Sequence, residues 1–345
     1  MSAKLESEAA YEATWIRMLQ RQFTRPKPLP ADTNLEGQTA IVTGSNGGLG
    51  LEACRQLLKL GLSRLVLGVR SQAKGEAAAN GLRQTFDKAD ISVWIVDHES
   101  YDSIREFVGK CETLPRLDIA ILNAAVITTS YTTVPSTGHE NILQVNYLST
   151  ALLAILLLPI LKSKKVPDAV RPPVLNLVGT DLMYQPEFVP RLTGPVLAQY
   201  DSAENFRFFP WYSGSKILLM CFVSRLARCV DANDVLINVS NPGLVKNTDL
   251  ARNGSIMVRT VMGIYQFFLG KSVESGASVY LEAALGQGPD SHGGFVSEWT
   301  IRPYPAVWYT TEGKEFTERL WEETMEELNF AGASKIIKDM KGSAD

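Results

Sequence analysis

The sequence is poor in the residues that build metal sites and disulfide frameworks. Only four cysteines and three histidines occur among its 345 residues. The cysteines lie far apart and form no CxxC pair, so their spacing predicts neither a metal site nor a disulfide network, and it favours a reducing compartment. They are Cys54, Cys111, Cys221 and Cys229.

A strong net charge is lacking as well. The chain has 34 Lys and Arg against 37 Asp and Glu, so no overall field favours nucleic acid or an acidic membrane surface as its partner. A small, weakly charged ligand fits better. The N-terminus, MSAKLESEAA, lacks the basic-then-apolar order of a secretory signal, which predicts a cytoplasmic protein.

No apolar run is long enough to span a bilayer. The longest, 147–161, has about fifteen residues where roughly 20 are needed, so it predicts a buried helix. A second apolar stretch, 256–269, is compatible with core, with a subunit interface or with peripheral contact with lipid. Membrane contact and a homo-oligomer are therefore left open.

Short apolar, β-branched runs alternate with longer helical patterns along most of the chain. The apolar continuity predicts strands buried on both faces, and the alternation predicts an α/β fold with a doubly wound, Rossmann-type parallel sheet. We expect the strands at 39–43, 64–69, 91–96, 117–122, 173–178, 235–240 and 293–296. We expect the helices at 49–60, 72–86, 100–112, 140–161, 212–230 and 312–330. This single domain would cover 35–345, after an N-terminal extension of one amphipathic helix and a proline-bearing linker at 1–34.

A glycine-rich turn, TGSNGGLG at 43–50, lies between the first predicted strand and the first predicted helix. Glycine lets the backbone turn tightly and approach a pyrophosphate, whose charge is met by amides at the helix N-terminus. The turn therefore predicts a dinucleotide site. Its cofactor-binding residues are expected to be Gly44, Ser45, Asn46, Gly48, Leu49 and Gly50.

Arg70 follows the second predicted strand, where a dinucleotide fold contacts the adenosine ribose. An NAD site needs an acid there, whereas Arg accommodates the 2′-phosphate of NADP, and Lys74 adds a second positive charge. The alternative is a solvated loop arginine, which leaves the cofactor preference open. Asp97 is a candidate for the adenine edge, and Asn123 with Ala124 for the cofactor's path, although Asp and Asn are also common turn residues.

Tyr212 and Lys216 lie four residues apart in YSGSK, on one face of a predicted helix. A nearby lysine, together with the positive nicotinamide of an oxidised cofactor, would lower the tyrosine pKa from its usual value near 10. The pair therefore predicts acid/base catalysis. The same spacing alone is also compatible with a surface tyrosine and a salt-bridging lysine.

Taken in order, these motifs resemble those of the short-chain dehydrogenase/reductases. The other motifs that carry the resemblance are NAA at 123–125, VN at 145–146 and NPGLVKNT at 241–248, and the match runs from about residue 35 to the C-terminal helix. The sequence looks closest to the branch containing retinol dehydrogenases, WW-domain oxidoreductases and many fungal metabolite reductases. The resemblance implies an oxidoreductase that uses NADPH or NADP+ to interconvert a carbonyl and an alcohol.

The resemblance also implies a role for each matched residue. Tyr212 would be the general acid/base, Lys216 would tune it and hold the nicotinamide ribose, and Asn146 would anchor a water that relays protons. The family's usual serine is replaced by Thr180, whose hydroxyl makes the same hydrogen bond. Remaining contacts to the cofactor are expected from Pro242, Gly243, Val245 and Thr248.

An insertion separates Thr180 from Tyr212 and is rich in aromatic residues and proline. With the apolar stretch that follows the NPG motif, it predicts substrate-covering segments at 181–211 and 249–270 and a largely apolar substrate. The alternative is that both segments form a subunit interface. A second function also stays open, because Thr180 and Ala125 depart from the family's usual residues: a cofactor-bound binding or scaffolding protein without turnover.

Overall fold

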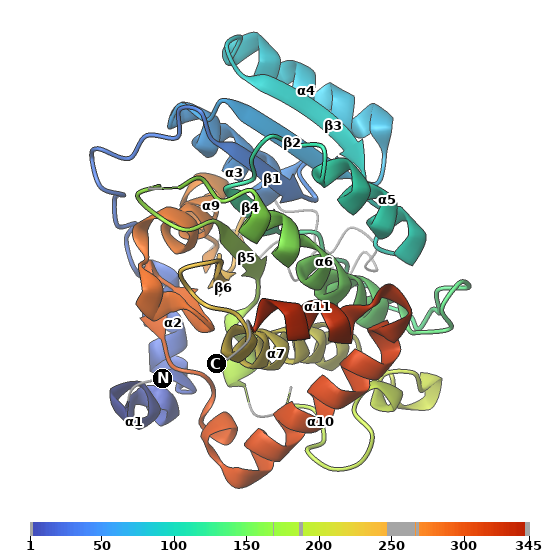
Figure 1. Cartoon of the computed structure of the whole chain (residues 1–345). Coiled ribbons are helices and arrows are strands. Elements are labelled where there is room, and N and C mark those ends of the chain that lie inside the picture. The colour runs from blue at the N-terminus through green and yellow to red at the C-terminus, as the bar shows by residue number, and fades with distance from the viewer. Residues whose placement is uncertain (1–2, 168, 186–188, 247–265, 267–268, 342–345) are drawn as a thin grey trace.

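One eight-stranded sheet organises the chain in the computed structural model, which describes residues 3–167, 169–185, 189–246, 266 and 269–341 (Figure 1). Its strand order is β3-β2-β1-β4-β5-β6-β7-β8, parallel throughout except between β7 and β8. The order reverses between β1 and β4, the kind of switch point at which doubly wound sheets bind ligands. The strands are β1 (Thr39–Thr43), β2 (Arg64–Val69), β3 (Asp90–Ile95), β4 (Ile119–Leu122), β5 (Val174–Val178), β6 (Leu236–Asn241), β7 (Gly294–Ser297) and β8 (Thr300–Arg302).

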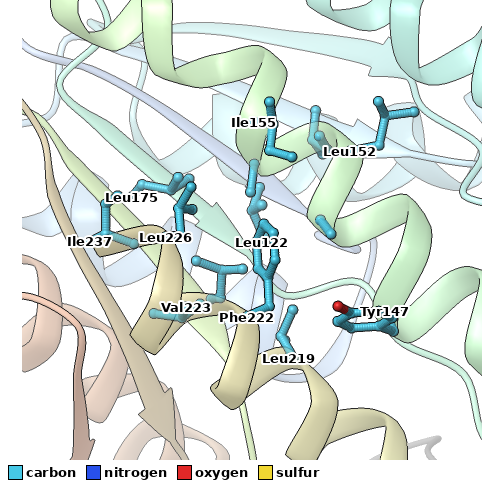
Figure 2. Close-up of a cluster of buried hydrophobic side chains, with 14 of the residues drawn as sticks. Leu122, Tyr147, Leu152, Ile155, Leu175, Leu219, Phe222, Val223, Leu226 and Ile237 are labelled. Atoms are coloured by element: carbon cyan, nitrogen blue, oxygen red, sulfur yellow. The ribbon is translucent and has the colours of Figure 1, made fainter. Parts of the chain in front are cut away.

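The sheet is buried on both faces, as the continuous apolar runs predicted. Successive strand side chains point to opposite faces, so Ala40 and Val42 join one core while Ile41 joins the other. The first core is closed by α3 (Gly48–Lys59), α4 (Gln72–Thr85) and α9 (Val273–Leu281). The second is closed by α5 (Tyr101–Cys111), α6 (Ser149–Ser163), α7 (Phe208–Leu226), α10 (Thr311–Glu327) and α11 (Ala333–Met340). Figure 2 shows α6 and α7 side chains packed on Leu122, Leu175 and Ile237 of the sheet.

The longest apolar run forms a core helix, which confirms its prediction. A π-helical turn at Leu143–Leu148 runs directly into α6. Together, Leu143–Ser163 are the one helix of the described chain that is long and apolar enough to cross a membrane. Yet 89% of its most apolar part is buried, as in the core helix of a folded domain.

Two helices, rather than the single one expected, precede the sheet: α1 (Ala3–Glu12) and α2 (Trp15–Phe23). The helical conformation is interrupted between them. A new helix begins because the Thr14 hydroxyl accepts a hydrogen bond from the amide of Arg17 and so caps the N-terminus of α2. The outer side of α2 is apolar and exposed, including Trp15 and Phe23. Its two arginines, Arg17 and Arg21, are buried instead and form ion pairs. Helix α2 is therefore attached to the rest of the protein by ion pairs rather than by an apolar face.

Further elements were not expected from the sequence: α9, α11 and β8. β7 and β8 are joined by a two-residue turn at Glu298 and Trp299, which have φ values of 49° and 58°. Such positive φ angles are unfavourable for bulky residues. Here the turn is held by a buried ion pair from Arg17 to Glu298 and by the packing of Lys271 over the Trp299 ring, 4.9 Å from its centroid.

Candidate active site

The glycine-rich turn between β1 and α3 is tightly packed against the sheet on one side and open on the other. Gly44 has φ +64°, and a Cβ there would lie 2.9 Å from the Ala124 backbone. A Cβ on Gly50 would lie 2.5 Å from the Gly44 carbonyl oxygen. On the outer side, a Cβ on Gly47 or Gly48 would meet nothing within 4 Å. No side chain caps α3, so its first amides remain able to meet a phosphate.

Asn123, at the end of β4, holds this turn in place. Its side-chain amide donates to the carbonyl oxygens of Thr43 at 2.9 Å and Gly44 at 3.2 Å. Its own oxygen accepts a hydrogen bond from the Tyr280 hydroxyl of α9 at 3.1 Å. Both polar atoms of the Asn123 side chain are therefore hydrogen-bonded. Tyr280 also lines the cleft, which the sequence did not suggest.

Arg70 lies at the end of β2 with an acidic neighbour that comes from the end of β3. Its guanidinium forms an ion pair with Glu99 at 2.8 Å, with 55% and 37% of the two side chains exposed. Lys74, in the first turn of α4, lines the same cleft. The positive charges predicted here are therefore present, but Glu99 partly offsets them.

Asp97 and His98 continue the wall after β3. The Asp97 carboxylate accepts a hydrogen bond from the Glu99 amide at 3.0 Å, so it also shapes its own loop. Burial lowers the pKa of His98 to about 4, which keeps its imidazole neutral at physiological pH.

Tyr212 and Lys216 lie on one face of α7, and both line the cleft, as their spacing predicted. The Lys216 ammonium donates to the Val178 carbonyl oxygen at 2.8 Å, and burial lowers its pKa to about 8. Burial, and then the charge of Asp181, raise the pKa of Tyr212 to about 12. The expected lowering of the tyrosine pKa is therefore not a property of the protein alone, because burial desolvates the phenolate and Asp181 adds a negative charge nearby.

Thr180 follows β5 and lines the cleft beside these residues. Its hydroxyl oxygen accepts a hydrogen bond from the Leu182 amide at 3.3 Å, which caps a short 3-10 helix at Asp181–Tyr184. The hydroxyl proton is not used by this cap, so it can be donated to a ligand oxygen.

Asn146 is fully buried behind the cleft wall rather than in it. Its side chain accepts from the Val126 amide at 2.8 Å and donates to the Val126 carbonyl oxygen at 2.9 Å. It also donates to the Ser215 hydroxyl at 3.2 Å. These hydrogen bonds connect the loop after β4 to α7.

The Pro242–Gly243 turn closes the cleft after β6. Gly243 has φ +73°, and its amide donates to the Asn241 side chain at 3.1 Å. Val245 lines the cleft one residue beyond Leu244, whereas Thr248 lies outside the described residues.

One cleft of about 370 Å³ brings most of the predicted residues together at the carboxyl ends of the strands. Ser45 does not line it, because its side chain is buried beneath the turn against Cys54. Within the described chain, no group of three or more His, Cys, Asp or Glu side chains is arranged to hold a metal ion. The predicted residues that line the cleft are Gly44, Asn46, Gly48, Leu49, Gly50, Arg70, Lys74, Asp97, Asn123, Ala124, Thr180, Tyr212, Lys216, Pro242, Gly243 and Val245.

Comparisons with known proteins agree with this geometry. Residues 38–170 match the family described as short chain dehydrogenase. The short chain dehydrogenase virL of Hypocrea virens is 57% identical over 343 residues, which span 99% of this chain and 100% of that protein. The chain belongs to the short-chain dehydrogenase/reductase family. The short chain dehydrogenase/reductase mfmJ of Annulohypoxylon moriforme is 46% identical and covers 95% of both chains. As a family member, the protein is an oxidoreductase that uses a nicotinamide cofactor and acts on a small molecule.

Solved structures of this family share the fold at low identity. The L-sorbose reductase of Gluconobacter frateurii, complexed with NADPH and L-sorbose, has a TM-score of 0.57 and 19% identity, covering 77% of this chain and 97% of that one. The NADPH-dependent 3-quinuclidinone reductase of Rhodotorula rubra has a TM-score of 0.57 and 21% identity, covering 84% and 99%. The short-chain dehydrogenase/reductase fold predicted from the motifs is therefore confirmed.

Proposed function

We propose that the protein is an NADPH-dependent reductase of secondary metabolism that interconverts a carbonyl and an alcohol on a largely apolar small molecule. The observation that carries this proposal is the meeting of Tyr212, Lys216 and Thr180 with the glycine-rich turn at a single cleft. An acid/base, a hydroxyl donor and a phosphate cradle are the groups that such a reaction needs.

The protein's own residues fit a dinucleotide phosphate. The open side of Gly47 and Gly48 and the uncapped start of α3 suit a pyrophosphate, and Arg70 with Lys74 suits the additional 2′-phosphate of NADPH. When bound, the cofactor supplies the hydride for carbonyl reduction or accepts it from an alcohol.

Tyr212 would supply the proton that accompanies the hydride. Because its pKa is about 12, the phenol is protonated throughout the neutral range, which is the form that carbonyl reduction requires. Thr180 would orient the substrate oxygen by donating its hydroxyl proton. Lys216 would hold positive charge beside the tyrosine and contact the cofactor's ribose. We propose that Asn146 acts from behind, by holding the Val126 backbone and α7.

We propose that segments 181–211 and 249–270 cover the substrate. Support comes from a cleft of about 290 Å³ in the first segment. Aromatic and apolar residues line it together with the polar Arg191, Gln199 and Asn205, and one of the aromatic residues, Trp211, is the chain neighbour of Tyr212. That segment also rests on α10, where the amides of Val196 and Leu197 donate to the Glu323 carboxylate. Most of 249–270 lies outside the described residues.

The decisive experiment is NADPH oxidation by the purified protein against a panel of apolar ketones and aldehydes, with NADH in a parallel series. We expect turnover with NADPH and with a subset of the larger apolar carbonyls. Tight NADPH binding with no carbonyl-dependent oxidation would instead identify a cofactor-bound binding or scaffolding protein.

A further inference from the structure

Helix α2, far from the active site in sequence, reaches the Pro242–Gly243 turn through Gln22. The Gln22 amide donates to the Leu244 carbonyl oxygen at 2.6 Å, and its oxygen accepts from the Leu244 amide at 3.2 Å. One side chain thus satisfies both polar backbone groups of a residue that lines the cleft. A side-chain amide is suited to this task because it is both donor and acceptor.

The turn is held from two sides, by the Gln22 side chain and by the backbone of Lys271. The Lys271 amide donates to the Leu244 carbonyl oxygen at 2.8 Å, and the Lys246 amide donates to the Lys271 carbonyl oxygen at 2.9 Å. A Cβ on Gly243 would lie 3.2 Å from the Gln22 side-chain oxygen, so Gln22 also packs against the turn itself. Its removal would free the amide of Leu244 and loosen the turn's contact with α2.

Arg21, the residue before Gln22, anchors the helix to the other side of the site. It is 2% exposed and donates to the Glu12 carboxylate at 2.8 Å and to the Asp181 carboxylate at 3.2 Å. Its guanidinium also lies over the Tyr184 ring, 4.7 Å from the centroid. Asp181 directly follows Thr180, which lines the cleft. Helix α2 is therefore fixed to one side of the cleft through Arg21 and to the loop on its other side through Gln22.

We propose that Gln22 is a positioning residue, through which the N-terminal helices fix the Pro242–Val245 loop and thereby set the affinity for the nicotinamide cofactor. This inference rests on the proposed function and on the family resemblance, which implies that Pro242, Gly243 and Val245 contact the cofactor. It assigns the N-terminal extension to the active-site architecture rather than to a separate module. Gln22 touches neither substrate nor cofactor in this role and acts only through Leu244.

The test compares Gln22→Met with Gln20→Met in the full-length protein. Methionine keeps the length of the side chain and its apolar contacts but removes both hydrogen bonds. Gln20 lies on the same helix, is exposed and contacts Tyr11 rather than the loop, so its substitution is the matched control. Three quantities are measured in each: the melting temperature, hydrogen exchange of the 241–246 amides, and the NADPH dissociation constant from its fluorescence.

We expect Gln22→Met to speed exchange of the Leu244 amide and to weaken NADPH binding by about tenfold, the usual worth of one hydrogen bond. The Gln20→Met protein should match the unmutated protein in both, and Gln22→Met should melt only a few degrees lower, because it loses the contacts of a single turn. With a carbonyl substrate, the KM for NADPH should rise in Gln22→Met more than kcat falls.

Equal amide exchange and equal NADPH affinity in the two variants would overturn the proposal. Faster exchange with unchanged NADPH affinity would also overturn it, because the contact would then be structural only. The proposed function can fail separately. If no carbonyl draws NADPH oxidation but Gln22→Met still weakens NADPH binding, the positioning role stands and the reductase proposal falls.

Discussion

Lys216 donates a hydrogen bond from its buried ammonium group to the backbone carbonyl oxygen of Val178, 2.8 Å away. This contact fixes the lysine to the end of β5, two residues before Thr180. It also connects α7, which carries Tyr212, to β5, which leads into Thr180. The relative placement of the two hydroxyls therefore depends on a charged group that has almost no access to water.

Tyr212→Phe tests whether the protein is an enzyme of the proposed kind. Phenylalanine preserves the ring packing and removes only the proton donor, so NADPH affinity and the melting temperature should change little. Carbonyl reduction should fall by about 10² to 10⁴, the usual contribution of a positioned general acid. Steady-state NADPH oxidation with the best ketone measures this. A variant as fast as the unmutated protein would rule out Tyr212 as the acid.

The two substitutions of Thr180 separate its hydroxyl from its methyl group. Thr180→Ala removes the hydroxyl, and with it both the cap on the Leu182 amide and the proposed donor to the substrate oxygen. Its kcat should fall, but by less than in Tyr212→Phe, since orienting a carbonyl is a lesser task than protonating it. Thr180→Ser keeps the hydroxyl and should react at nearly the unmutated rate. If both variants were equally slow, the methyl group rather than the hydroxyl would be the important feature.

Glu99 is expected to oppose NADPH binding, because it competes with the 2′-phosphate for Arg70. The Arg70–Glu99 pair is exposed, and such pairs contribute only about 0 to 1 kcal/mol, so Arg70 is readily released. Glu99→Gln should therefore tighten NADPH binding, whereas Arg70→Asp should erase or invert the preference over NADH. Fluorescence titrations with both cofactors measure these effects.

A matched control exists at the other end of the same two strands. Arg64 and Asp90 form a surface ion pair at 2.8 Å across β2 and β3, where these strands begin. Asp90→Asn should leave both cofactor affinities unchanged. Equal affinity of the unmutated protein for NADPH and NADH would refute the role given to Arg70.

The parts of the fold that could be predicted are those encoded locally. Each strand of the parallel sheet is a continuous apolar run, since it is buried on both faces. The carboxyl ends of parallel strands meet at one edge of a sheet, so the residues that follow them, such as Arg70, Asn123 and Thr180, come together there. The same rule could have found His98 and Glu99, which directly follow Asp97. β8 was missed because a three-residue strand has no period to detect, and Tyr280 was missed with its helix α9.

Other features depend on contacts that no local pattern contains. Ser45 belongs to the glycine-rich motif, but only the three-dimensional path of the turn directs its side chain inward. Gln22 and Leu244 are 222 residues apart, and nothing in the sequence distinguishes Gln22 from the neighbouring Gln20 on the same short helix. The pKa of Tyr212 was expected to fall because its lysine is visible in the sequence, whereas the extent of burial is not.

His139 joins three separate parts of the protein and should make its stability depend on pH. Its Nδ1 lies 2.8 Å from the Asp201 carboxylate in the insertion, and its Nε2 lies 3.3 Å from the Glu327 carboxylate at the end of α10. Hydrogen bonds to Asp201 and then to Glu327 raise the pKa of His139 to about 9, against 6.5 for an ordinary histidine. The folded state therefore binds the proton more tightly than the unfolded state does.

The stabilisation from this proton is fully present below about pH 6.5 and is lost as the pH rises through about 9. His139→Gln cannot take up the proton, so it should be destabilised by on the order of 3 kcal/mol at pH 6 and by much less near pH 9.5. Urea unfolding of both proteins at pH 6, 7.5 and 9.5 measures the difference, and groups that titrate alike in the two proteins cancel from it. Asp201→Asn retains the imidazole but removes its first carboxylate, so it should move the same loss of stability to lower pH. A His139→Gln difference that is independent of pH would mean that the ring contributes by packing rather than by its charge.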